Sequence, residues 1–170
     1  MDDKRAIELL LGTAQEAAES IGATLGAGED WDTIAIVASE DALVSVIKLP
    51  FSNPEEKEEV LFRAFPDALM RSRARAVVLA LPSWLSQARG KMPDVMPSED
   101  PERQEILMLL GITAKHVETR IAEVRREKGK PQLGGWQAAE DIFGGQTSQM
   151  GGAIVEMVVA ALSGVEASRN

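Results

Sequence analysis

The segment PSEDPERQEILMLLGI, residues 97–112, decides the fold of this chain of 170 residues. Its second half carries five consecutive apolar residues, Ile106 to Leu110, which is the pattern of a strand buried on both faces. We therefore predict a central strand over residues 105–113. Its first half crowds Glu99, Asp100, Glu102 and Glu105 into seven residues, and these acids form either a ligand site or a solvated turn.

Three further strands are predicted on the amino-terminal side of this segment. The β-branched residues 33–38 and the apolar residues 43–50 flank a short polar turn, which is typical of a hairpin. Residues 74–81 (ARAVVLAL) form a short apolar run that predicts another strand covered on both faces. Residues 82–104 are rich in Pro, Ser, Gly and Asp and are expected to form a long loop.

Residues 115–129 fit two patterns. Val117, Ile121 and Val124 have helical spacing, whereas Val117, Thr119 and Ile121 alternate as in a strand. We choose the strand, because the short step from Thr113 permits a hairpin and the central strand needs a neighbour. Residues 130–136 are interpreted as a turn-rich exit.

Helices are expected at four places. Residues 3–21 carry apolar residues at spacings of three and four, and residues 54–72 begin with a capping Asn53 and a first-turn Pro54, although Pro66 is expected to bend or divide that helix. Residues 138–143 have room for one helical turn. Residues 148–164 predict a closing helix that is apolar nearly all round.

The elements therefore follow the order αββαβββα in one α+β domain over residues 1–170. A hairpin, a crossover helix and a three-strand meander make a five-stranded, mostly antiparallel sheet with helices covering it. This order resembles the profilin-like architectures, which include roadblock, longin and GAF-type domains. The resemblance is one of element order only, so it implies a fold and no activity.

A second resemblance is local. The segments ARAVVLALPSWLS, PSEDPERQEILMLLGI and GKPQLGGW, in that order, resemble a group of small uncharacterised bacterial and phage-associated proteins. The likeness covers roughly residues 33–137. That group has no assigned chemistry, so it carries no site residues to this chain, and its pattern favours a strand at 115–127.

Composition narrows the range of partners. With 27 acidic and 18 basic side chains the formal charge is -9, which repels nucleic acid and anionic lipid surfaces. The absence of cysteine excludes disulfides, thiolate metal sites and cysteine nucleophiles. No export signal or bilayer-length apolar stretch is visible, so we expect a soluble, cytoplasmic protein without a cofactor.

Two features could carry a function. If the chain is an enzyme, Glu99, Asp100, Glu105 and His116 are the candidate metal or acid–base residues, although the acids lack the glycine that calcium loops need and are better explained as a solvated turn. Glu118 could orient His116. The closing helix could instead contact a second chain through Ile154, Met157, Val158 and Leu162, unless the first helix covers it.

We therefore expect a non-enzymatic protein-interaction module that self-associates as a homodimer. One alternative is an acidic chaperone-like or adaptor protein that binds an extended partner segment along a sheet edge or groove. A second alternative is a metal-assisted hydrolase.

Overall fold

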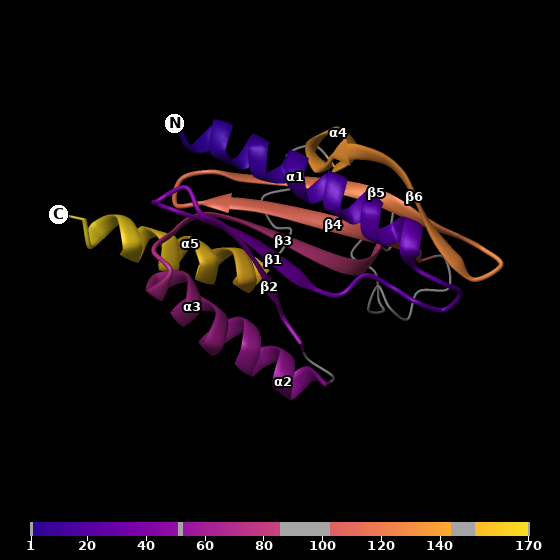
Figure 1. Ribbon diagram of the computed structural model, residues 1–170, viewed down its shortest axis with the longest axis horizontal. Coiled ribbons are helices and arrows are strands. Elements are labelled where there is room, and N and C mark those ends of the chain that lie inside the picture. Colours follow the sequence, from indigo (N-terminus) through magenta and orange to yellow (C-terminus); the bar gives the residue numbers. More distant parts are fainter. Residues whose placement is uncertain (1, 51–52, 86–102, 144–151, 170) are drawn as a thin grey trace.

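The computed structural model describes residues 2–50, 53–85, 103–143 and 152–169. Within these ranges the chain forms an α+β fold built on one antiparallel sheet of six strands in the order β2-β1-β3-β4-β5-β6. Helix α1 crosses one face of the sheet, and α3 and α5 lie together on the other (Figure 1).

The strands are β1 (Ile34–Ser39), β2 (Val44–Lys48), β3 (Ala74–Leu85), β4 (Gln104–Thr113), β5 (Val117–Glu127) and β6 (Lys130–Ala138). The helices are α1 (Asp3–Thr24), α2 (Pro54–Glu59), α3 (Phe65–Arg71), α4 (Ala139–Phe143) and α5 (Gly152–Ala167), with a π-helical turn (Val60–Ala64) joining α2 to α3. None of the helices in the described ranges combines the length and the apolar character that crossing a membrane requires.

Strand β4 is central, as the apolar run in residues 106–110 predicts. It pairs along its length with β3 and β5, and its side chains enter the cores on both faces. Leu109 packs against α1, whereas Met108 and Leu110 pack against the helices of the other face. The strand interpretation of residues 115–127 is confirmed by β5.

The sheet has six strands, so the prediction of five is wrong. Residues 130–138, interpreted as a turn-rich exit, form β6 and pair antiparallel with β5. Pro131, Gly134 and Gly135 depress the strand propensity of this segment, and an edge position tolerates all three because its outer side needs no ladder hydrogen bonds.

Strand β3 also extends further than expected. It continues through Pro82 to Leu85, where we predicted the start of a loop. The register explains why proline is tolerated: β1 pairs with β3 only as far as Ala80, so Pro82 faces a partner, Leu107, on one side alone. The rest of the predicted loop, residues 86–102, lies outside the described residues.

The helix predicted over residues 54–72 is continuous in the structure but contains the π-helical turn just before Pro66. Proline has no N–H to donate and its ring crowds the carbonyl four residues earlier. The wider turn accommodates this, as the N–H of Phe65 reaches the carbonyl of Val60 five residues back.

Candidate interaction surface

Strand β2 forms one edge of the sheet and, among the described residues, pairs only with β1. The Ser39 N–H donates to the Leu43 carbonyl over 2.9 Å, and the Leu49 N–H donates to the Thr33 carbonyl over 3.0 Å. Because hydrogen-bonded and non-bonded pairs alternate in an antiparallel ladder, the backbone groups between them alternate in direction. The backbone N–H and C=O groups of Val44, Val46 and Lys48 therefore point away from the sheet.

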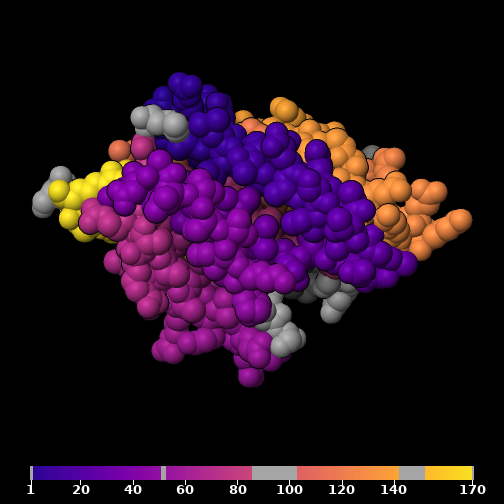
Figure 2. Space-filling model, in the orientation of Figure 1, coloured from indigo at the N-terminus to yellow at the C-terminus, as the bar shows by residue number. Residues whose placement is uncertain are grey.

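This edge is apolar. The side chains of Leu43, Val44 and Val46 are 71%, 56% and 65% exposed. Val46 lies opposite Ile36, which is buried under α1, so Val44 and Val46 sit on the α1 face and Leu43 on the other. We call residues Leu43–Lys48 the β2 edge. Figure 2 shows the purple atoms of this part of the chain at the surface beside the indigo atoms of α1.

Charged side chains lie at both ends of the β2 edge. At its carboxyl end Lys48 forms an exposed ion pair with Asp32 at 2.8 Å. At its amino end the turn carries the exposed Asp41 and the half-buried Glu40. Each end of the strand therefore carries charges of both signs, since Arg73 and Arg169 pair with Glu40 at the amino end.

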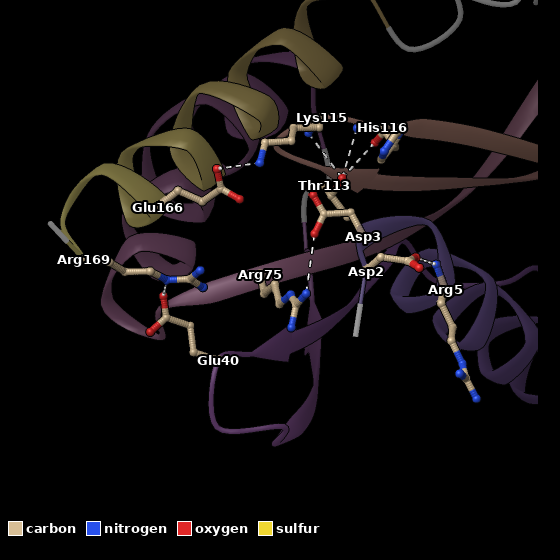
Figure 3. Close-up of polar contacts among 10 residues, drawn as sticks. All are labelled: Asp2, Asp3, Arg5, Glu40, Arg75, Thr113, Lys115, His116, Glu166 and Arg169. Atoms are coloured by element: carbon tan, nitrogen blue, oxygen red, sulfur yellow. Dashed lines mark hydrogen bonds and ion pairs between the residues drawn. The ribbon is translucent and has the colours of Figure 1, made fainter.

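Glu40 fixes that turn to two distant parts of the chain. Its carboxylate accepts a hydrogen bond from Arg169, just after α5 (Figure 3). It also accepts one from Arg73, just before β3, at 2.9 Å. These contacts, led by the hydrogen bond from Arg169, hold the pKa of the Glu40 carboxyl below its usual value. The turn that begins β2 is thus held in place.

The opposite edge of the sheet, β6, has a different character. It combines Pro131 and the Gly134–Gly135 pair with the polar Lys130 and Gln132, and its register with β5 shifts between Ala122 and Val124. Proline, charge and irregular register are the features that prevent an edge from pairing with another chain. Of these two edge strands, β2 is the one suited to strand addition.

The start of β5 also lacks a strand partner on one side, and the short helix α4 contacts this strand. Strand β6 pairs with β5 only from Arg120 onward, so residues 117–119 have β4 as their partner on one side and no strand of the described chain on the other. A hollow of about 780 Å³ opens beside them. It is lined by side chains of mixed charge, among them Lys4, Glu8, His116, Glu118 and Glu140.

The candidate metal residues do not meet. Glu105 opens β4, where its carboxylate accepts a 2.9 Å hydrogen bond from Arg126. His116 lies beyond the other end of β4, in the turn before β5, and the rise of a strand separates the two ends by roughly 25 Å. Glu99 and Asp100 lie outside the described residues. In the part of the chain that the structure describes, no group of three or more His, Asp and Glu could hold a metal ion.

His116 belongs to a tight hairpin turn. Its N–H and that of Lys115 both donate to the Thr113 hydroxyl, at 3.0 and 3.3 Å (Figure 3). The carboxylate of Glu118, the residue expected to orient His116, accepts instead from Arg120 at 3.3 Å. The hydrogen bonds around Thr113 thus stabilise the hairpin turn, and the one between Arg120 and Glu118 lies along β5.

The four α5 residues expected at a dimer interface divide into two classes. Val158 and Leu162 are buried in the core of a single chain, so they are not available to a second one. Ile154 and Met157 are partly buried against the same core. The cover for α5 comes from the sheet and α3 on one face, whereas α1, which we considered as cover, lies on the opposite face.

The β2 edge was not singled out in the sequence. The apolar residues on both faces of LVSVIK, residues 43–48, are as typical of a buried strand as of this exposed edge. No protein-family model, curated protein or solved structure significantly matches the chain.

Proposed function

We propose that this protein is a non-enzymatic protein-interaction module that self-associates, and that the β2 edge is its binding surface. The proposal rests on one observation. A single edge strand combines backbone N–H and C=O groups that point outward with exposed apolar side chains. Unpaired N–H and C=O groups on a sheet edge bind an added strand through the main chain, and apolar side chains add affinity.

The contrast between the edges supports this assignment. A free apolar edge is an aggregation hazard that proteins usually suppress, and β6 carries several suppressing features while β2 retains Leu43, Val44 and Val46. An exposed apolar edge that is present only at β2 therefore supports a binding role for that strand.

Light scattering coupled to size exclusion tests self-association. We expect a mass about twice the 18.3 kDa of one chain, falling toward that of one chain on dilution. A mass of one chain at every concentration up to about 1 mM, where an interaction of only about 4 kcal/mol would be detected, contradicts the proposal.

A second candidate is an adaptor that binds an extended segment of another protein. The free stretch at residues 117–119 favours it, because a segment that added to β5 there would lie along the neighbouring hollow. The three glutamates and one lysine among the residues lining that hollow favour a basic segment. Chemical-shift changes confined to residues 117–119 on addition of a lysine-rich peptide would distinguish this adaptor from binding at β2.

We do not propose the metal-assisted hydrolase. Its motive was the convergence of Glu99, Asp100 or Glu105 with His116. Glu105 lies at the start of β4 and His116 beyond its other end, whereas Glu99 and Asp100 lie outside the described residues. A thermal-shift assay with divalent metals tests this choice. Stabilisation by a metal that is lost in His116→Ala would revive the hydrolase.

A further inference from the structure

We infer that the partner of the β2 edge is the β2 edge of a second copy, paired antiparallel about a twofold axis at Ser45. The two six-stranded sheets then join into one continuous sheet of twelve strands. This inference rests on the proposed self-association and specifies its geometry.

Backbone direction limits the register. In an antiparallel ladder, residues whose N–H and C=O groups point outward must face residues of the same kind. An axis at Ser45 places Val44 of each copy opposite Val46 of the other, and both residues point outward. It gives two hydrogen-bonded pairs, and Ser45 faces Ser45 of the second copy in the non-bonded position between them.

Side-chain matching then selects this axis. With the axis at Ser45, the valines of both copies gather on the α1 face, and Leu43 lies opposite Ile47 of the second copy on the other face. An axis at Val46 satisfies the backbone as well, but it sets Lys48 opposite Val44 and Ser45 opposite Ile47. Matched apolar cross-strand pairs are the more stable arrangement.

The charged residues at the two ends permit this register. Ala42, with a φ of 59° and its N–H bonded to the Ser39 carbonyl, belongs to the turn, so the ladder between the copies ends at Leu43, and Lys48 of each copy lies toward the turn of the other that carries the exposed Asp41. The present partner of Lys48 is Asp32, in a pair whose side chains are 70% and 66% exposed, and such pairs are weak enough to rearrange. An exchange of Asp32 for Asp41 leaves the number of ion pairs unchanged, so the apolar side chains and the main chain supply the attraction between the copies.

The segment is therefore its own complement in backbone direction and in side-chain type. A surface that is self-complementary about a twofold axis produces a closed dimer, because each copy uses its edge once. That is why a second copy, and not an unrelated chain, is the occupant.

Disulfide trapping tests the axis directly. The chain has no cysteine, so Ser45→Cys introduces a single thiol, and its counterpart across the axis lies at the roughly 4.5 Å Cα separation of a non-bonded pair, within disulfide range. We expect mild oxidation to convert most of this variant into a covalent dimer on a non-reducing gel. Gln137→Cys, on the exposed part of β6, is the matched control and should remain mostly monomeric on that gel.

Val46→Cys tests the register. It should link much more slowly than Ser45→Cys, since Val46 faces Val44 of the second copy. Faster linking of Val46→Cys than of Ser45→Cys overturns the axis at Ser45.

A second variant tests the edge without relying on a covalent bond. Val46→Lys sets a cation against Val44 of the second copy at two places, and we expect the dimer dissociation constant to rise at least tenfold. Gln137→Lys, at an exposed position on β6 at the opposite edge of the sheet, should leave it unchanged. Circular dichroism checks that both variants keep the fold.

The outcomes separate this inference from the proposed function. A monomeric wild-type protein contradicts both. A dimeric wild-type protein in which Ser45→Cys fails to link, or in which Val46→Lys still dimerises with unchanged affinity, overturns the β2 pairing and leaves self-association standing.

Discussion

Gly111 shows how one residue sets the distance between a helix and the sheet. It lies on the central strand β4, and a Cβ built on it would approach Ile7 Cγ2 at 2.8 Å and two Leu11 side-chain carbons at 3.2 Å. Both side chains belong to α1 and are almost completely buried. The helix can pack this closely on the strand only because position 111 has no side chain.

We expect Gly111→Ala to lower the free energy of unfolding by about 1–3 kcal/mol, the usual cost of overpacking a core. Urea denaturation at fixed protein concentration measures it. Gly135→Ala is the matched control, because Gly135 is also a strand residue but a Cβ added there would meet no atom of a non-adjacent residue within 4 Å. It should change stability by no more than about 0.5 kcal/mol. Equal losses in the two variants would contradict the close-packing explanation.

At the scale of elements, α5 is a core helix. Its residues Val158, Ala161, Leu162 and Val165 are buried against the sheet and α3, which accounts for most of its apolar character. A helix that is apolar nearly all round indicates burial on several sides. A single sequence does not say whether the cover comes from the same chain or from another.

Leu162→Ala should therefore destabilise the folded chain by about 2–5 kcal/mol through the lost contacts and the cavity left behind. Ser163→Ala, at the exposed neighbouring position, should be nearly neutral. Thermal unfolding compares them. If Leu162 lay at a dimer interface instead, its variant would dissociate in light scattering while its thermal stability fell little.

Several elements could be predicted from the sequence, and the reasons for the failures are local. Runs of β-branched and apolar residues located β1 to β4, and the periodicity of residues 3–21 located α1. Strand β5 followed from the need of the central strand for a neighbour, because its own pattern also fits a helix. Strand β6 was missed because Pro131 and two glycines resemble a turn, and the end of β3 was missed because Pro82 resembles a strand end.

The candidate surface was missed for a different reason. Whether β2 lies at an edge depends on where the crossover places β3, and that is a property of sheet order that residues 43–48 do not contain. The acidic residues near 99–105 suggested a metal site because carboxylates are common ligands of divalent metals. Only the register showed that Glu105 and His116 lie far apart.

On the scale of the whole molecule, Glu40 connects parts that are distant in the sequence. Through Arg73 and Arg169 it joins the β1–β2 turn to the start of β3 and to the end of α5. Since these hydrogen bonds lower the pKa of Glu40 in the folded state, they stabilise the fold above the pKa that Glu40 has in the unfolded chain. This contribution is lost as the pH falls through the lower, folded-state value.

We therefore expect Glu40→Gln to be less stable than the wild type at pH 7, and the difference to shrink progressively below about pH 4.5. Urea denaturation across pH 3 to 7 follows it. Glu58→Gln removes an exposed carboxyl from α2 without touching this contact and serves as the control. A difference that stayed constant across the pH range would show that the carboxylate charge is not what matters.

The connectivity of the sheet also has a consequence for folding kinetics. Strands β4 to β6 are joined by short hairpin turns and β3 joins them across residues 86–103, whereas β1 must find β3 across about 35 intervening residues. We expect the β1–β2 hairpin to dock late. Until it does, β3 presents an open edge that β1 of another molecule fits equally well, so crowded refolding should yield strand-exchanged dimers.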